Sequence, residues 1–281
     1  MRRWAVDGEQ QTPVGLLRSR AETMSQAPFL DFGGEVFTFE QTWTHAERTA
    51  RGLRRLGVGS GDTVLGMLDN GLDTLGLWLG SNLLGAVWVG VNTALRGDFL
   101  QHVITDADAK VVVCEPDFVG RLAGLDNDAL RARTVLVRGD GSTRPADLSF
   151  DVRSLHEFHV DGASEDWVHQ GLSDVSLLIY TGGTTGPSKG CIISNGYVVN
   201  IARGFIEQTE RTADEVNWNP LPMFHLNVLG TTVVGSMVLG GAGAIAPRFS
   251  VSEFWPEIER TGARNVNHLG SKSAMLATPP D

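Results

Sequence analysis

Cysteine is almost absent from this chain, since only Cys114 and Cys191 occur among 281 residues. Both lie in apolar runs typical of strands, and two are too few for the disulfide framework of a small secreted protein. We expect two buried free thiols rather than a disulfide, which favours a reducing, cytoplasmic compartment. No apolar segment follows Arg2 and Arg3, so a secretory signal peptide is not predicted.

Positive charge is also scarce. Lys and Arg number 23 against 33 Asp and Glu, which gives a formal net charge of −10. With no basic cluster to offset this acidity, the composition argues against a nucleic-acid-binding protein. A hydrophobic content of 42% and a charged content of 20% are those of an ordinary globular chain, long enough for one large domain or two small ones.

Long apolar runs are few. Residues 228–247 carry no charge and are formally long enough to span a bilayer. The run is rich in Gly, Thr and Ala, however, and Gly240 and Gly241 interrupt it. We therefore expect a buried helix over about 228–239 and a strand over about 242–246, with no stable membrane span.

Helical patterns and short β-branched runs alternate through the first half of the chain. Thr38 followed by Gln41 is a capping box at the start of one helix. This alternation predicts an α/β fold in which helices cover a mostly parallel sheet. The expected helices lie near 13–24, 40–56, 73–84 and 97–106, and the expected strands at 64–68, 87–91, 110–114 and 134–137.

A polar stretch over 138–174 separates two parts of the pattern. We expect a loose tail at 1–12, a first α/β subdomain over 13–174, and a second over 175–281. The polar stretch should hold loops and one short helix near 152–158. His156, His159 and His169 fall near it, but their loose spacing and the distance to either cysteine do not predict a zinc site.

The most informative segment is residues 180–190, which read YTGGTTGPSKG. An apolar strand over 175–179 leads into it, and the short strand 191–193 follows it. Glycines let backbone N–H groups approach an anion closely, hydroxyls add donors, and a lysine adds a positive charge. A strand that runs into such a loop is suited to binding polyphosphate.

Two familiar glycine-rich loops are excluded. A P-loop requires glycine before its lysine and Ser or Thr after it, whereas Lys189 lies between Ser188 and Gly190. The other glycine cluster, residues 57–62, has Asp62 at the third glycine position of the dinucleotide fingerprint, and no strand precedes it. We interpret that cluster as the end of a helix and a turn.

The 180–190 loop closely resembles the phosphate-binding signature of the adenylate-forming superfamily, which contains acyl-CoA synthetases, luciferases and peptide-synthetase adenylation domains. That signature is aromatic-Thr-(Ser/Gly)-Gly-Thr-Thr-Gly-x-x-Lys-Gly, and this sequence fits it throughout. Within the superfamily the chain looks most like carnitine/crotonobetaine-type and fatty-acid-type CoA ligases. Further segments that resemble the family lie at 37–43, 56–64, 85–96, 219–227 and 269–273.

The resemblance implies two stacked, helix-covered, mostly parallel sheets. It also implies ATP-dependent activation of a carboxylic acid to an acyl-adenylate, followed by transfer to CoA, with Mg²⁺ as a further cofactor. The implied partners are a small-molecule acid, ATP and CoA, and a homodimer stays open.

The resemblance also assigns roles to residues. The phosphate-binding positions are Thr181, Gly182, Gly183, Thr184, Thr185, Gly186 and Lys189, and Thr184 is the hydroxyl expected near the metal. Lys189 and His225 are the expected catalytic residues. The expected acid-binding residues are Phe224, His225, Asn227 and Gly270.

Several family motifs have no counterpart here. The later aromatic-Gly-x-Thr-Glu motif, the ribose-binding aspartate and the small C-terminal domain with its catalytic lysine are not found. The resemblance therefore implies a fragment of the large domain, incomplete at its C-terminus. Two alternatives stay open: a nucleotide-binding remnant without turnover, and an adenylation domain that loads a carrier protein instead of CoA.

Overall fold

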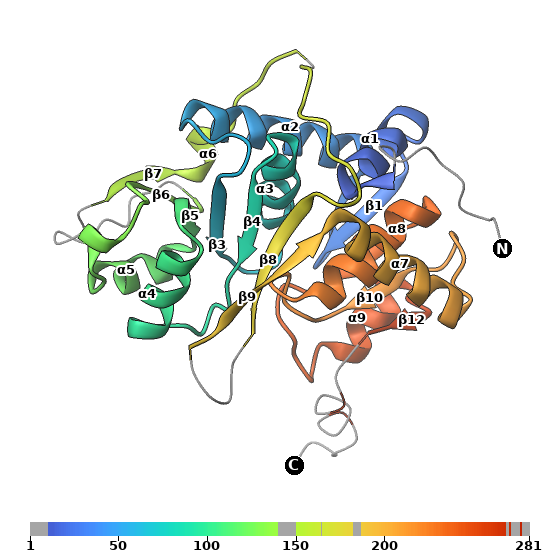
Figure 1. The fold of residues 1–281 in the computed structure, drawn as a ribbon. Helices are drawn as coiled ribbons and strands as arrows, with labels where there is room; N and C mark the ends of the chain where they lie inside the picture. Colours follow the sequence, from blue (N-terminus) through green and yellow to red (C-terminus); the bar gives the residue numbers. More distant parts are fainter. Residues whose placement is uncertain are drawn as a thin grey trace. The chain divides into compact units, whose positions relative to one another are not determined.

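A computed structural model describes residues 11–139, 150–163, 165–181 and 187–267, together with Gly270 and Leu276 (Figure 1). The chain divides into two compact units. Unit 1 comprises Met1–Trp43, Asn70–Leu72 and Tyr197–Asp281, and unit 2 comprises Thr44–Asp69 and Asp73–Gly196. Each unit contains one sheet. The two helix-covered, mostly parallel sheets expected from the sequence are confirmed.

The sheet of unit 2 has seven strands in the order β7-β6-β5-β3-β4-β8-β9. All neighbours are parallel except β8 and β9, which form an antiparallel hairpin. The strands are β3 (Thr63–Met67), β4 (Val87–Gly90), β5 (Ala109–Cys114), β6 (Thr134–Val137), β7 (Asp151–Ser154), β8 (Val175–Thr181) and β9 (Lys189–Ser194).

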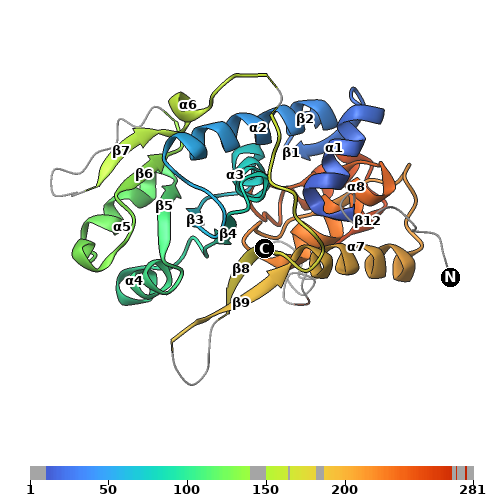
Figure 2. The same ribbon diagram turned by 45° about the horizontal axis from the view of Figure 1, so that its top comes forward.

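Strand order places the helices of unit 2 on opposite faces of this sheet. The chain steps from β3 to β4 through α3 (Leu72–Leu83), then back past β3 to β5 through α4 (Gly97–Asp106). Because parallel crossovers are right-handed, this reversal puts α3 and α4 on opposite faces (Figures 1 and 2). The switch point lies between β3 and β5, at their carboxyl ends.

Both faces of the sheet are apolar, which explains the β-branched runs. Leu100 and Val103 of α4, with Val119 of α5 (Val119–Ala123), pack in one core cluster with the strand residues Val89 and Val112. On α3, Trp78 donates its indole N–H to Ser176 Oγ at 3.0 Å. The 3-10 turns η2 (Pro116–Phe118) and η3 (Asn127–Ala129) complete the connections.

Helix α2 (Phe39–Arg55) begins with the expected capping box. The Gln41 N–H donates to Thr38 Oγ1 at 3.1 Å, and the Thr38 N–H donates to Gln41 Oε1 at 2.8 Å. Leu53, near the end of this helix, is fully buried. This helix therefore ends where its local sequence predicts, within one residue.

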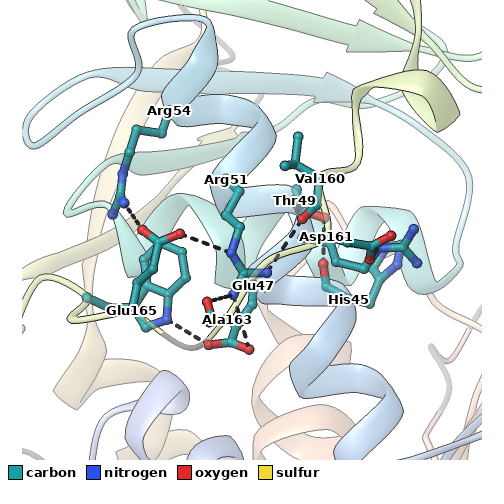
Figure 3. Close-up of polar contacts among 11 residues, drawn as sticks. His45, Glu47, Thr49, Arg51, Arg54, Val160, Asp161, Ala163 and Glu165 are labelled. Carbon is teal, nitrogen blue, oxygen red and sulfur yellow. Dashed lines mark hydrogen bonds and ion pairs between the residues drawn. The ribbon is translucent and has the colours of Figure 1, made fainter.

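The expected helix near 152–158 is only partly correct. Residues 151–154 form β7, and the helix α6 is limited to Leu155–Phe158, because β7 pairs with β6. Beyond α6, residues 159–163 and 165–167 run along α2; we call them the crossing segment. Arg51 of α2 donates to Ala163 O at 2.7 Å and to Glu165 Oε1 at 3.1 Å (Figure 3).

The sheet of unit 1 has five strands in the order β12-β10-β11-β1-β2. Only the β1–β2 hairpin is antiparallel. The strands of this sheet are β1 (Pro28–Phe32), β2 (Glu35–Thr38), β10 (Asn217–Asn219), β11 (Gly243–Ile245) and β12 (Asn265–Val266). The helices of unit 1 are α1 (Pro13–Thr23), α7 (Asn195–Thr209), η4 (Val228–Val234), α8 (Gly235–Leu239) and α9 (Phe254–Thr261). The first two residues of α7 belong to unit 2.

The uncharged run 228–247 folds as the sequence predicts, with one refinement. Its helical part begins as the π-helix η4 and continues as α8, and Gly240 ends it in the left-handed conformation. Strand β11 follows. No helix in the described part of the chain is long and apolar enough to cross a membrane.

One expectation about the cysteines differs from the structure. Cys114 is buried as expected, but Cys191 is exposed, because β9 is the last strand of its sheet in the described part of the chain. The expected subdomain boundary between residues 174 and 175 stays a prediction, and the compact units divide elsewhere. Residues 175–196 belong to unit 2 because β8 pairs with β4.

Candidate functional site

The predicted phosphate loop connects the two strands of a β-hairpin. Strands β8 and β9 pair from Val175 opposite Ser194 to Thr181 opposite Lys189. Directly opposed residues of an antiparallel pair project from the same face of the sheet. The side chains of Thr181 and Lys189 therefore project from the same face at the loop end of the hairpin, and both residues are exposed.

The glycines and hydroxyls between these two positions lie outside the described residues. They are Gly182, Gly183, Thr184, Thr185 and Gly186. Their expected phosphate contacts, and the expected role of Thr184 at a metal, therefore stay predictions. The described ends of the loop fit a polyphosphate, because they present a cation and a hydroxyl that an anion can reach.

Helix α4 holds both arms of this hairpin. The hydroxyl of Tyr180 donates to Asp106 Oδ2 at 2.7 Å, and His102 Nε2 lies 2.7 Å from the carbonyl oxygen of Ser188. Burial and the neighbouring Asp106 carboxylate both raise the pKa of Tyr180, so it stays a neutral donor. Sequence reasoning missed His102 and Asp106, because no local pattern marks a contact across 74 or 86 residues.

Gly190 explains why an aromatic residue and a glycine recur together in the signature. A Cβ atom added at Gly190 would lie 3.1 Å from Tyr180 Cζ, closer than an ordinary contact. The aromatic ring lies against the bare backbone of the opposite strand. A larger residue at position 190 would push the ring away from its bond to Asp106.

The second group of predicted residues lies in unit 1, between β10 and η4. The rings of Phe224 and His225 lie with their centroids 4.5 Å apart, and the His225 N–H donates to Pro222 O at 3.0 Å. Phe224 is half-buried and His225 is exposed. The imidazole is therefore accessible to a small molecule, while its backbone is fixed in a turn.

Buried asparagines hold this turn in place. Asn70 donates to Leu221 O at 3.0 Å and accepts from the Met223 N–H at 2.7 Å. Asn219 donates to Asn227 Oδ1 at 3.0 Å, so the expected acid-binding Asn227 has its side-chain oxygen engaged within the fold. The sequence analysis did not find Asn70 and Asn219 as supports of this turn, since Asn70 is 151 positions away from Leu221.

Gly270 is the last of the predicted acid-binding positions. It is exposed, and a Cβ added there would meet no atom within 4 Å. Its neighbours Leu269 and Ser271 lie outside the described residues. Its role at an acid pocket stays a prediction.

Comparison with known proteins gives consistent relatives. The chain is 29% identical over 281 residues to a sulfoacetate–CoA ligase of Cupriavidus necator. The matched region covers 96% of this chain and 52% of the relative. It is 29% identical over 272 residues to a medium/long-chain-fatty-acid–CoA ligase of Mycobacterium tuberculosis, covering 94% and 43%. The chain thus spans about half the length of the curated relatives it matches.

A solved structure shows the same fold. The crystal structure described as a putative long-chain-fatty-acid CoA ligase from Rhodopseudomonas palustris superposes with a TM-score of 0.84 at 25% identity. The match covers 94% of this chain and 65% of that one.

The family comparison covers nearly the whole chain, because residues 17–271 match the AMP-binding enzyme family. The matched range contains both the β8–β9 hairpin and the turn that carries His225. The chain therefore belongs to the AMP-binding enzyme family, and the two curated relatives named above are CoA ligases.

Proposed function

We propose that this chain carries the phosphate-binding and acid-binding segments of an ATP-dependent acid–CoA ligase. In the proposed reaction, a carboxylate oxygen attacks the α-phosphorus of ATP, pyrophosphate leaves and an acyl-adenylate forms. The thiol of CoA then attacks the acyl carbon and AMP leaves. The observation that carries the proposal is the pairing of Thr181 with Lys189 at the loop end of a hairpin, within the family match.

Lys189 and Thr181 act on the phosphates in this proposal. The exposed ammonium of Lys189 offsets the negative charge of the triphosphate, and the Thr181 hydroxyl donates from the same face. Tyr180 and the bond of His102 to Ser188 O keep the two arms in register. Thr184 is the hydroxyl proposed near Mg²⁺, which would balance further phosphate charge.

His225 acts on the acid in this proposal. Its exposed imidazole can donate a hydrogen bond to a carboxylate, and Phe224 supplies an apolar surface beside it. The relatives named above act on sulfoacetate and on fatty acids, so the acid class is left as a carboxylic acid with an unspecified tail. CoA is the proposed acceptor, because both of these relatives are CoA ligases. We place the reaction in the cytoplasm.

The test measures equilibrium binding of ATP with Mg²⁺ by calorimetry, for the wild-type chain and for Lys189→Ala. A charge-assisted hydrogen bond contributes about 1.5–3 kcal/mol, so the dissociation constant for ATP should rise roughly 10- to 100-fold. Arg18→Ala removes the same charge from an exposed helical position and should leave ATP binding unchanged. Equal ATP affinity in Lys189→Ala and the wild type would contradict the proposed role.

Acid-dependent exchange of labelled pyrophosphate into ATP is the accompanying activity measurement. The acid panel contains fatty acids of several lengths, an aromatic acid and sulfoacetate. Exchange with one acid class supports adenylation and identifies the acid. ATP binding without exchange for any acid would support the nucleotide-binding remnant instead, and acyl transfer to a carrier protein but not to CoA would support the carrier-loading domain.

A further inference from the structure

Two histidines and one aspartate converge in unit 2, away from the hairpin. His45 lies on α2, Asp73 in the first turn of α3, and His159 directly after α6. One ring nitrogen of each histidine and one carboxylate oxygen of Asp73 all lie within 4.8 Å of one another. The three side chains are partly buried, so the cluster is sheltered but reachable from solvent.

From this geometry we infer that His45, Asp73 and His159 form a binding site for a divalent transition-metal ion, with Zn²⁺ as the expected occupant. Two imidazoles and one carboxylate are a ligand set that zinc accepts, with a fourth position open to water. Soft or borderline nitrogen ligands favour Zn²⁺ over Mg²⁺ and Ca²⁺, which prefer oxygen. The site is independent of the proposed ATP chemistry.

The spacing of the ligand atoms suits a four-coordinate ion. Metal–ligand bonds of about 2.0–2.1 Å in a tetrahedron place ligand atoms roughly 3.3 Å apart. His45 Nε2 already lies 3.2 Å from Asp73 Oδ1. The rings of His45 and His159 have their centroids 4.6 Å apart. Since the three ligand atoms already lie within 4.8 Å of one another, side-chain shifts on the order of 1 Å would bring them to tetrahedral spacing.

The ring nitrogen Nε2 of His159 points to an occupant that the protein itself does not provide. It is shielded from solvent, and within the described part of the chain it has no hydrogen-bond partner. A buried polar atom without a partner costs free energy, and such an atom is expected to meet a water or an ion. Coordination of a metal would satisfy this nitrogen.

Asp73 is held so that one oxygen stays available. Arg138 Nε lies 3.1 Å from Asp73 Oδ2, on the carboxylate oxygen that does not contact His45. An outer partner of this kind orients a ligating carboxylate. Arg138 also pairs with Glu115 at 2.6 Å, which offsets the positive charge that would otherwise oppose a cation.

The nearby Arg48 is likewise neutralised. Its Nε lies 2.8 Å from Oδ1 of Asp161, a residue of the crossing segment that begins with His159. This pair and the Val160 N–H bond to Arg48 O at 3.3 Å keep the crossing segment on α2. The position of His159 is therefore fixed by contacts outside the proposed ligand set.

A glycine makes room for the His45 ring. A Cβ added at Gly76, one turn along α3 from Asp73, would lie 2.4 Å from His45 Cδ2 and 2.8 Å from His45 Nε2. Any larger residue at position 76 would force the imidazole out of its present place. Asp73 also follows the end of β3 beside the switch point of the sheet, where open α/β sheets commonly bind ligands.

The test uses untagged 281-residue protein, stripped with a chelator and titrated with Co²⁺, whose visible d–d absorption reports coordination. We expect one Co²⁺ per chain, displaced by Zn²⁺ and not by Mg²⁺. Zn²⁺ at about 100 times its dissociation constant should also raise the Tm by roughly 5 °C.

His159→Gln should weaken Co²⁺ binding at least tenfold, whereas the control His156→Gln, an exposed histidine three residues away, should bind as the wild type does. Gly76→Ala keeps all three ligands but displaces the His45 ring, so it should also weaken Co²⁺ binding. This variant tests the inference if His159→Gln does not fold. Absence of Co²⁺ binding by the wild type, equal binding by His159→Gln, or equal loss in His156→Gln would each overturn the inference.

Discussion

The exposure of His225 bears on its proposed role at the acid. The side chain is exposed, while the turn that carries it is fixed by the bonds of Asn70 and Asn219. A histidine that served only as a core residue would be buried. The residue therefore fits a role at a ligand better than a role in packing.

We expect His225→Ala to change the kinetics with the acid and to leave stability nearly unchanged. The KM for the acid should rise, or kcat should fall, by about tenfold, which corresponds to a loss of ~1.4 kcal/mol. The free energy of unfolding should change by less than about 0.5 kcal/mol, because the side chain is exposed. Steady-state kinetics and urea unfolding of the acid-activating enzyme measure both quantities.

Asn219→Ala is the contrasting variant. It leaves the partner atoms of a buried amide unsatisfied and should lower the free energy of unfolding by about 1–3 kcal/mol. A large stability loss in His225→Ala with unchanged kinetics would assign His225 to the fold instead.

At the scale of single elements, local sequence predicts where several helices and strands begin and end. The capping box of α2 is an example, since Thr38 and Gln41 need only each other and the backbone. Helix α4 occupies 97–106, the range that its sequence predicts. One exception is β7, which replaces the first half of an expected helix, because a strand is stabilised by its neighbour β6 rather than by its own residues alone.

We expect Thr38→Ala to destabilise the protein by about 1 kcal/mol, since it removes the N-cap acceptor of α2. Thermal or urea unfolding measures the change. Thr38→Ser retains an oxygen acceptor and should recover most of the loss. Equal stability of Thr38→Ala and the wild type would show that the cap seen at Gln41 contributes little.

The hairpin of β8 and β9 shows the limit of local prediction at this scale. The sequence predicts both strands and the loop between them, but not their antiparallel pairing or the anchoring to α4 through Tyr180 and His102. Those contacts join segments far apart in the chain, so no short window contains both partners. The register that places Thr181 opposite Lys189 became visible only with the sheet.

At the scale of the whole molecule, the two cysteines of unit 2 differ in their exposure to solvent. Cys114 lies in the core of the seven-stranded sheet, where burial raises the pKa of its thiol to about 12. Cys191 is exposed on β9. Since the thiolate is the reactive form, the two should differ greatly in reactivity at neutral pH.

We expect a thiol reagent at pH 8 to modify one cysteine of the native protein quickly and the other only as unit 2 unfolds. Peptide mapping should identify Cys191 as the fast site, and Cys191→Ser should remove the fast phase. Below its raised pKa the Cys114 thiol stays neutral in the folded state. Raising the pH from 7 to 9 should therefore not by itself make Cys114 react with the reagent. Fast labelling of Cys114 in the native state would contradict its placement in the core.

The sequence alone predicted the family and the α/β class, and both are confirmed, because they depend on short motifs and on periodic burial. It also predicted many of the helices and strands, including those between residues 40 and 114, but not β1, β2, β7, β10, β12, α5 or α9. Tertiary structure alone decided which strands pair, which residues fall into each unit and which residues support the site. His45, Asp73 and His159 come from three separate stretches, and the loosely spaced histidines at 156, 159 and 169 gave no sign of them. Chain topology brings such residues together in space, and no short sequence pattern predicts that they meet.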